Sequence, residues 1–298
     1  MLQSLLKEML EVIDGICREE KIPYMLWGGS CLGAVREHDI IPWDDDLDII
    51  VWRKDKKRIE EALRKKLPER FCLVTPEDNF PYFHDFMTRV ENKDYLLHEP
   101  TEADKAQDNR QNHVFIDVFT LDCTGRSQAE VKVRKYIYWF IWMLSMGHRY
   151  ELDLNAYGGK ATQFAVKLVT AAGRLIPMPV LKKIRDSFCT QIKPEGACYV
   201  GRYDTVFAGV KVKKKTKYDY HRSWFARQRL VRFGDRKYPV PAGFDRYLTH
   251  EYGEYMKPVN DSSTYEKHYI WIAGGNTFRI IKLWNGTRLI SMSTAFLS

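Results

Sequence analysis

The chain carries two adjoining motifs, Leu26-Trp27-Gly28-Gly29-Ser30-Cys31-Leu32-Gly33-Ala34-Val35-Arg36 and, shortly after it, Ile40-Ile41-Pro42-Trp43-Asp44-Asp45-Asp46-Leu47-Asp48-Ile49-Ile50-Val51. In the first motif an apolar run ends in Gly-Gly-Ser and passes into a helical pattern. Free backbone N–H groups and the macrodipole favour an anion at the start of such a helix. The second motif packs four carboxylates into five residues, and charges this close repel one another.

The acidic motif predicts a strand and a cation site. If a strand runs from Asp46 to Val51, its two-residue period puts Asp46 and Asp48 on one face and apolar residues on the other. The acids then converge while the opposite face packs into a core. Hard oxygen ligands favour Mg²⁺ or Mn²⁺, and Mg²⁺ completes its shell with waters and substrate phosphates. We expect Asp44 to be a further ligand or a residue that orients Asp46.

Three other interpretations of this stretch exist. The pattern Gly28-x-Ser30-x-x-Gly33, with Asp48 about twenty residues on, imitates a dinucleotide-binding fingerprint, but Ser30 replaces the second glycine. The spacing Asp44-x-Asp46-x-Asp48 also imitates the start of an EF-hand loop, but Ile49 stands where that loop needs glycine. A solvated acidic turn is the third alternative.

A second acidic site lies in the alternating stretch from His113 to Asp122, which reads as a strand. Asp117 has apolar neighbours on both faces of this strand. Burying an unpaired carboxylate is costly, so Asp117 is expected to have a cation, a hydrogen-bond partner or a catalytic task. The alternative is a buried aspartate satisfied by backbone donors.

These pieces resemble the nucleotidyltransferase fold of the polymerase beta type enzymes. More closely, Gly28-Gly29-Ser30-x-Leu32-Gly33-Ala34-Val35-Arg36 with Ile41-Pro42-Trp43-Asp44-Asp45-Asp46-x-Asp48 resembles the signature of the LicD family, the phosphocholine transferases that include the fukutin-related proteins. The helix before Ile22-Pro23-Tyr24, the Asp117 strand and the segment Phe244 to Pro258 also match that family. The family's Asp-Gly-Gly-Thr turn is Trp27-Gly28-Gly29-Ser30 here, and this departure bears on the acceptor or the head group.

The resemblance implies an α/β (α+β) fold, with a nucleotidyltransferase-like mixed sheet flanked by helices and an additional helical region. We expect a catalytic core at residues 1–125, a helical and C-terminal part at 126–268, and an extension of unknown role at 269–298. Strands are expected at about 23–27, 46–51, 71–75, 84–91 and 113–121, and helices at the N-terminus, 31–37, 54–66 and within 128–191. Residues 101–112 are expected to form a loop at the rim of the site, and Asn285-Gly286 predicts a hairpin.

The reaction that the resemblance implies is transfer of a phospho-alcohol, foremost phosphocholine from CDP-choline, to a sugar hydroxyl of a cell-surface glycan, with release of CMP. Asp46 and Asp48 would hold the metal, and Asp117 would hold a second metal or take the acceptor proton. The expected substrate-binding residues are Gly28, Gly29, Ser30, Arg36 and Trp43.

Two of these assignments have plain alternatives. Arg36 could instead be a surface residue that pairs with Glu37 or Asp39. A choline head group needs an aromatic cage, for which the candidates are Trp27, Trp43, Tyr82 and Trp224, but aromatic residues are more often part of a core. Two other functions also stay open: a nucleotidyltransferase that attaches a nucleoside monophosphate to a small molecule or RNA, and a catalytically silent glycan-binding protein.

The composition bears on partners and location. Lys and Arg outnumber Asp and Glu by 47 to 39, which gives a net charge of +8 and favours an anionic nucleotide, glycan or membrane surface. No nucleic-acid recognition motif is evident, so nucleic acid is not an expected partner. Six scattered cysteines predict reduced thiols and a cytoplasmic enzyme. The apolar run Tyr136 to Met146 is too short to cross a bilayer and predicts a core helix or a peripheral contact with the inner membrane face, where a lipid-linked glycan could be the acceptor.

Overall fold

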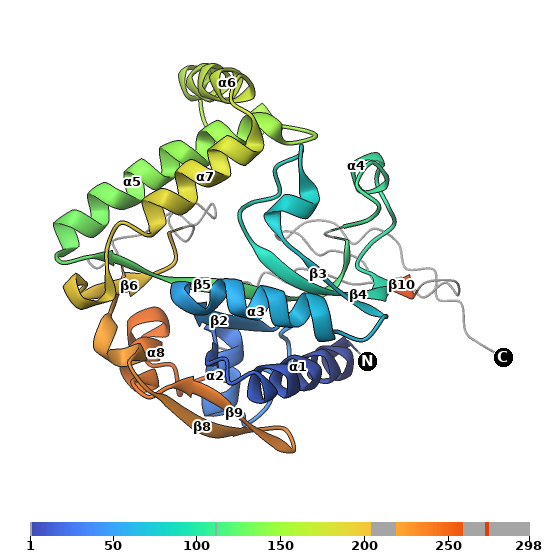
Figure 1. Cartoon of the computed structure of the whole chain (residues 1–298), viewed down its shortest axis with the longest axis vertical. Helices are drawn as coiled ribbons and strands as arrows, with labels where there is room; N and C mark the ends of the chain where they lie inside the picture. The colour runs from blue at the N-terminus through green and yellow to red at the C-terminus, as the bar shows by residue number, and fades with distance from the viewer. Residues whose placement is uncertain (1, 111, 204–218, 259–271, 274–298) are drawn as a thin grey trace.

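The computed structural model describes residues 2–110, 112–203, 219–258 and 272–273. Within these residues, one mixed sheet of eight strands forms the centre of the molecule, as Figure 1 shows. Its strands are β1 (Tyr24–Leu26), β2 (Asp48–Trp52), β3 (Phe71–Val74), β4 (Thr88–Leu96), β5 (His113–Gly125), β6 (Tyr199–Gly201), β7 (Tyr220–His221) and β10 (Ile272–Ala273). A separate hairpin consists of β8 (Gln228–Phe233) and β9 (Arg236–Pro241).

The long strand β5 organises the sheet. It pairs in parallel with β2 and antiparallel with β4 and β6. β1 pairs antiparallel with β2, on the side of β2 that faces away from β5. β3 pairs antiparallel with β4. β6 follows the helical region in the sequence and pairs with β5, so the sheet contains strands from both sides of the expected division at residues 125/126. That division stays a prediction.

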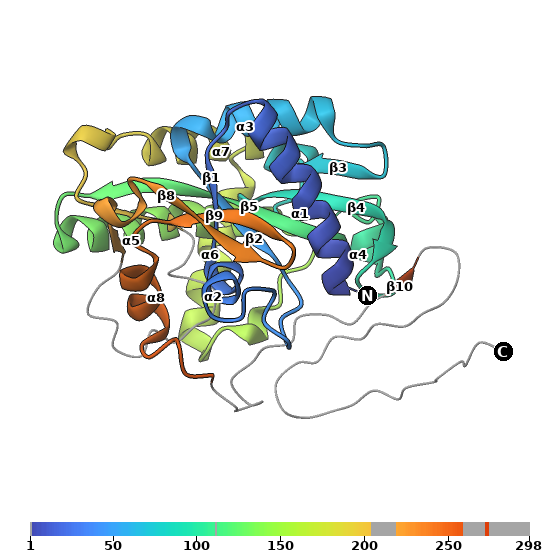
Figure 2. The same ribbon diagram turned by 90° about the horizontal axis from the view of Figure 1, so that it is seen from below.

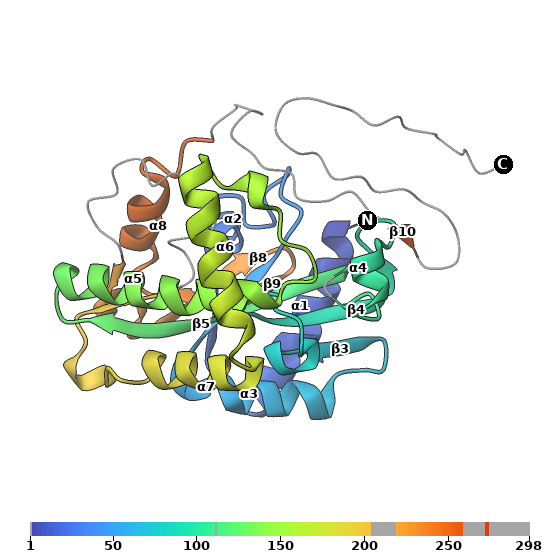
Figure 3. The same cartoon turned by 90° about the horizontal axis from the view of Figure 1, so that it is seen from above.

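Helices cover both faces of the sheet. Figures 2 and 3 show α3 and α7 on one face and α2 and α8 on the other. The α-helices in the described residues are α1 (Leu2–Glu19), α2 (Gly28–Arg36), α3 (Arg53–Lys66), α4 (Glu102–Lys105), α5 (Gln128–Ser145), α6 (Lys160–Arg174), α7 (Met178–Cys189) and α8 (Phe244–Tyr252). Because both faces are covered, Ile49, Ile50 and Val51 of β2 are all fully buried. The expected mixed sheet flanked by helices is confirmed.

Several predicted boundaries were wrong. The helix expected from Cys31 begins at Gly28, so the glycines form its first turn. The acidic strand begins at Asp48 and leaves Asp46 in the preceding loop, where repelling carboxylates can spread apart. The strand expected at 84–91 lies at Thr88–Leu96. The loop expected at 101–112 contains the short helix α4, which Thr101 and Asp104 cap reciprocally.

The hairpin expected around Asn285-Gly286 lies outside the described residues. The β8–β9 hairpin was not predicted, and its turn contains Gly234 at a φ of +59°, a backbone conformation that glycine adopts without a steric penalty. This hairpin places β9 against β1.

The apolar run in α5 has two different faces. Tyr138 and Ile141 are buried in a second apolar cluster with Leu181 and Phe188 of α7, and Met143 is buried as well, whereas Tyr136 and Phe140 are exposed. The expected core helix is therefore confirmed for one face of α5 only. No single helix in the described part of the chain meets the length and hydropathy needed to cross a membrane, and α6 and α7 meet them only as a pair bent by 104°.

Candidate active site

Two acids meet in the middle of the sheet. Asp48 at the start of β2 is the direct neighbour of Asp117 on β5. Adjacent strands lie about 4.8 Å apart and paired residues point to the same face. That face is the one that α2 and α8 cover, and Asp117 is only 8% exposed. Both acids lie on strands, as the sequence predicted, and the parallel register brings them together.

Hydrogen bonds join the start of α2 to the start of β2. The Asp48 N–H donates to Ser30 Oγ at 2.8 Å, and the Trp27 N–H donates to the Asp48 carbonyl at 3.0 Å. Gly28 has a φ of +54° and donates its N–H to Tyr247 Oη of α8 at 3.0 Å. The buried Ser30 side chain thus aligns two elements, a role that the sequence did not suggest.

The two glycines leave room for carboxylates. A Cβ added at Gly29 would lie 2.6 Å from Oδ2 of Asp44, and one added at Gly28 would lie 3.4 Å from Oδ2 of Asp48. Asp44 and Asp48 therefore lie directly over the first turn of α2. The positive end of this helix faces the acids.

We expect Gly29→Ala to lower catalytic turnover by about a hundredfold, because the added methyl group must displace the Asp44 carboxylate, and small misplacements of reacting groups cost this much. The measurement is steady-state turnover together with a thermal melt. Gly15→Ala in α1 is the matched control, since nothing lies within 4 Å of its added Cβ. Equal activity of Gly29→Ala and Gly15→Ala would contradict the prediction.

The acids strongly disfavour one another's charge. Burial, followed by the charges of Asp46 and Asp45, raises the pKa of Asp44 to about 8. Burial also raises the pKa of Asp48 well above its ordinary value, with Asp46 and then Asp117 as the next causes. The site thus favours an added proton or a cation.

The metal-free protein is therefore expected to lose stability as the pH rises from 5 to 8. Asp44 has a higher pKa when folded than its ordinary value of 3.8, so the folded state binds the extra proton and its stability falls as that proton leaves. Thermal melts across this range in the presence of a chelator should show the decrease, and Asp44→Asn should flatten it. Parallel pH profiles for the two proteins would refute the assignment.

Two arginines of the site were missed in the sequence. Arg89 of β4 donates from Nε to Asp117 Oδ1 at 2.7 Å, and its guanidinium lies 3.9 Å from the centre of the Phe115 ring. The guanidinium carbon of Arg202 lies 3.1 Å from the centre of the Phe119 ring. Burial and the neighbouring acids raise the pKa of Asp48, whereas the charge of Arg202 acts to lower it. Both supply positive charge beside the acids.

A buried lysine holds Arg202 in place. Lys135 of α5 donates to the Arg202 carbonyl at 2.8 Å and pairs with Asp219 at 2.6 Å. Both side chains of this pair are almost fully buried. No local pattern could signal the contact, because α5 and β6 are separated by two helices in the sequence.

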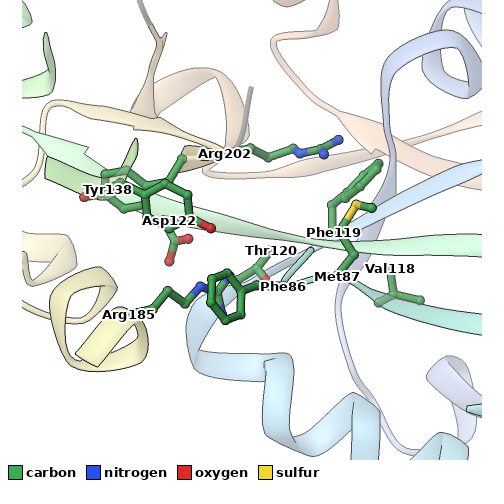
Figure 4. A pocket seen from close by; sticks show the side chains of 10 residues that line it. Phe86, Met87, Val118, Phe119, Thr120, Asp122, Tyr138, Arg185 and Arg202 are labelled. Carbon is green, nitrogen blue, oxygen red and sulfur yellow. The ribbon is translucent and has the colours of Figure 1, made fainter. Parts of the chain in front are cut away.

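A small cavity adjoins the site beside residues 118–122 of β5. Figure 4 shows Phe119 and Arg202 along one part of its wall and Asp122 and Arg185 along another. The cavity has room of about 20 Å³, enough for a single water molecule. Such a water would satisfy the buried Nε of Arg185, which has no partner in the structure. The cavity is too small for a nucleotide.

Arg36 forms the ion pair with Glu37 that the alternative expected, but its side chain is only 8% exposed, so it is not a surface residue. Its part in substrate binding stays a prediction. Its Nε pairs with Glu37 Oε1 at 2.6 Å and its Nη1 donates to the Tyr255 carbonyl at 3.0 Å. Arg36 thus connects α2 to the segment after α8. Trp43 is half-buried against the main core, and its part in substrate binding stays a prediction.

The four aromatic candidates do not form one cage. Trp27 is buried and stacks on Tyr247 at 4.8 Å between ring centres. Trp224 belongs to the same aromatic cluster through Tyr220. Tyr82 instead contacts Tyr150. Trp27 is therefore a core residue.

The acids of the site were expected to hold a divalent cation. Across the described residues, no three His, Cys, Asp or Glu side chains already stand as a metal-binding group. Asp44, Asp46 and Asp48 nevertheless offer oxygen donors only, and their charges oppose one another. This chemistry fits Mg²⁺ or Mn²⁺, which accept carboxylates and retain several waters. The carboxylates would have to rotate toward a common point.

Comparisons with known proteins agree with this geometry. The LicD/FKTN/FKRP nucleotidyltransferase domain matches residues 21–151, which include Asp44, Asp46, Asp48 and Asp117. The lipopolysaccharide cholinephosphotransferase LicD of Haemophilus influenzae is 25% identical over 255 residues, covering 84% of this chain and 88% of that protein. The human ribitol 5-phosphate transferase FKRP is 39% identical over 56 residues, covering 19% of this chain and 11% of that protein.

Proposed function

Because residues 21–151 match the LicD/FKTN/FKRP nucleotidyltransferase domain, we propose that the chain transfers a phospho-alcohol group from a cytidine diphosphate carrier to a sugar hydroxyl of a cell-surface glycan precursor, releasing CMP. The observation that carries the proposal is the pairing of Asp48 with Asp117 on neighbouring strands, with Asp44 beside the start of α2. Phosphocholine is the preferred group, because the relative that matches along most of its length is a cholinephosphotransferase.

Asp44, Asp46 and Asp48 would hold Mg²⁺ or Mn²⁺. When bound, the ion supplies positive charge to the donor diphosphate and to the leaving phosphate oxygen. In-line displacement at phosphorus needs mainly positioning and charge neutralisation. Asp117 would complete the metal site or accept the proton of the attacking sugar hydroxyl, held in either role by Arg89.

The remaining residues would orient the donor. The N–H groups of Gly29 and Ser30 lie in the first turn of α2, where no intrahelical acceptor exists, and would face the diphosphate. Arg202, whose charge already acts on Asp48, would pair with a phosphate oxygen. Its planar guanidinium suits such bidentate contacts.

The donor can be identified by thermal shift. CDP-choline, CDP-ethanolamine, CDP-glycerol, CDP-ribitol, CTP and ATP are compared in the presence of Mn²⁺, because a ligand that binds the folded state raises its melting temperature. A CDP-alcohol should give the largest shift, and CMP should appear when a glycan acceptor is added. Release of pyrophosphate from CTP or ATP would identify a nucleotidyltransferase instead, and binding of glycan alone would favour a silent binding protein.

We further propose that the reaction occurs in the cytoplasm, on a glycan precursor carried by a lipid at the inner membrane face. The scattered cysteines support a reducing compartment. The test is fractionation of cells that express the tagged protein, with the membrane-associated share compared before and after a salt wash. A protein recovered outside the cell would contradict this location.

A further inference from the structure

Exposed apolar side chains gather on one part of the molecule. Of the large apolar side chains exposed in the described residues, eleven of fourteen lie between positions 133 and 184. Single exposed apolar residues are ordinary, but a contiguous group marks an interaction surface. This group lies on α5, α6, α7 and their connections.

The outward face of α6 is apolar. Phe164 and Leu168 are 69% and 63% exposed, and Leu175 just after the helix is 85% exposed. Ala161, Ala165 and Ala172 are exposed as well, and all six positions fall on one stripe of a helix with 3.6 residues per turn. The opposite stripe of Val166, Thr170 and Gly173 is buried. An amphipathic helix of a water-soluble domain would present polar residues at these outward positions.

The orientation of α6 is set by close backbone contacts. A Cβ at Gly173 would lie 1.9 Å from the Leu144 carbonyl, and a Cβ at Gly147 would lie 2.1 Å from the Thr170 carbonyl. These contacts admit no larger side chain. The helix therefore cannot turn its apolar stripe inward without losing its packing against α5.

Basic residues border the apolar stripe. Lys160, Lys167 and Arg174 recur every seven residues, so they form a second stripe along one side of the first. The helix contains no acidic residue, and the nearest acids before it in the sequence are Glu151 and Asp153. Lys and Arg beside an apolar face are typical of helices that lie in the interface of an anionic bilayer.

The exposed stripe continues onto α5. Val133, Ile137 and Phe140 are exposed and recur at helical spacing, and the same stripe reaches Leu144, where α6 crosses it. α6 thus covers only the C-terminal end of this stripe. Figure 1 shows α6 at the outer edge of the molecule, opposite the β8–β9 hairpin.

We propose that α6 and the exposed face of α5 form a docking surface for an anionic membrane. The apolar stripe enters the interface, while Lys160 and Lys167 contact lipid phosphates. A second copy of the chain is the less suitable occupant, because α6 contains no acidic residue to pair with the basic stripe of another copy. The proposal rests on this surface alone and holds whatever group the enzyme transfers.

Vesicle co-sedimentation tests the surface with two double variants, Phe164→Glu with Leu168→Glu and Lys160→Glu with Lys167→Glu. These side chains are exposed, so the fold should be retained, which circular dichroism and a thermal melt would verify. The wild type should bind vesicles of phosphatidylcholine with phosphatidylglycerol at low salt and release them at high salt. The affinity of each double variant for these vesicles should be lower by at least about tenfold.

Leu230→Glu is the matched control, since Leu230 is 56% exposed on the distant hairpin and should leave binding unchanged. Turnover with a water-soluble acceptor should be the same for all these variants, which separates this surface from the catalytic site. Failure of the wild type to bind anionic vesicles would overturn the proposal, as would equal binding by the Phe164 and Leu168 variant. A lipid-independent dimer that this variant dissociates would assign the surface to a second copy.

Discussion

Replacing Asp48 or Asp46 by asparagine is expected to abolish metal-dependent transfer, with turnover at least about a thousandfold below wild type, the scale of losing a main source of transition-state charge stabilisation. The fold should be retained and the metal-free protein should melt at the same or a higher temperature. The reason is that burial and then the charges of Asp46 and Asp117 raise the pKa of Asp48, so removing one charge relieves repulsion. Turnover at several Mn²⁺ concentrations and a thermal melt with a chelator measure both effects.

Asp235→Asn is the matched control for this experiment, because Asp235 is exposed in the turn between β8 and β9. It should leave turnover and melting temperature unchanged. Near wild-type turnover of either Asp46→Asn or Asp48→Asn would show that the metal assignment is wrong. A lower melting temperature without metal would instead show that the carboxylates stabilise the fold.

Asp117→Asn is the second change with a large expected effect. If Asp117 serves the acceptor, turnover should fall about a hundredfold or more while the affinity for the donor stays unchanged. If Asp117 is a metal ligand, turnover and donor affinity should both fall. Donor affinity from calorimetry and turnover from CMP release distinguish these cases.

Arg89→Gln supplies the comparison for Asp117, because Arg89 is its ion-pair partner. A purely structural ion pair would lose the same stability through either variant, and turnover would follow stability in both. We expect Asp117→Asn to lose far more turnover than Arg89→Gln at equal melting temperature. Unchanged turnover and donor binding in Asp117→Asn would reduce this residue to a structural carboxylate.

Local pattern was sufficient to single out the acids. The Gly-Gly-Ser turn, the cluster from Asp44 to Asp48 and the isolated Asp117 all stood out, because spacing along a chain dictates which side chains share a face. The same reasoning predicted most of the strands and helices in their order along the chain, whereas the mixed sheet was expected from the resemblance to the LicD family. It placed the start of a strand at Asp46, because periodicity does not record how repulsion between acids affects a boundary.

The partners of those acids required the tertiary structure. Arg89 reaches Asp117 only through the β4–β5 register, and Arg202 approaches Asp48 only because β6 returns to pair with β5. Tyr247 meets the Gly28 N–H from a segment more than two hundred residues away. Such contacts leave no periodic trace in the sequence, since they depend on which strands become neighbours.

Exposure was likewise a tertiary outcome. The apolar residues of α5 predicted either a core or an interface, and the same residues proved to form both, because α6 covers only the end of one stripe. Trp27 and Trp224 looked like candidates for a cage, yet packing with Tyr220 places both in one aromatic cluster. Composition and spacing determine which side chains can be buried together, whereas the packing of distant segments decides which of them are buried and which remain on the surface.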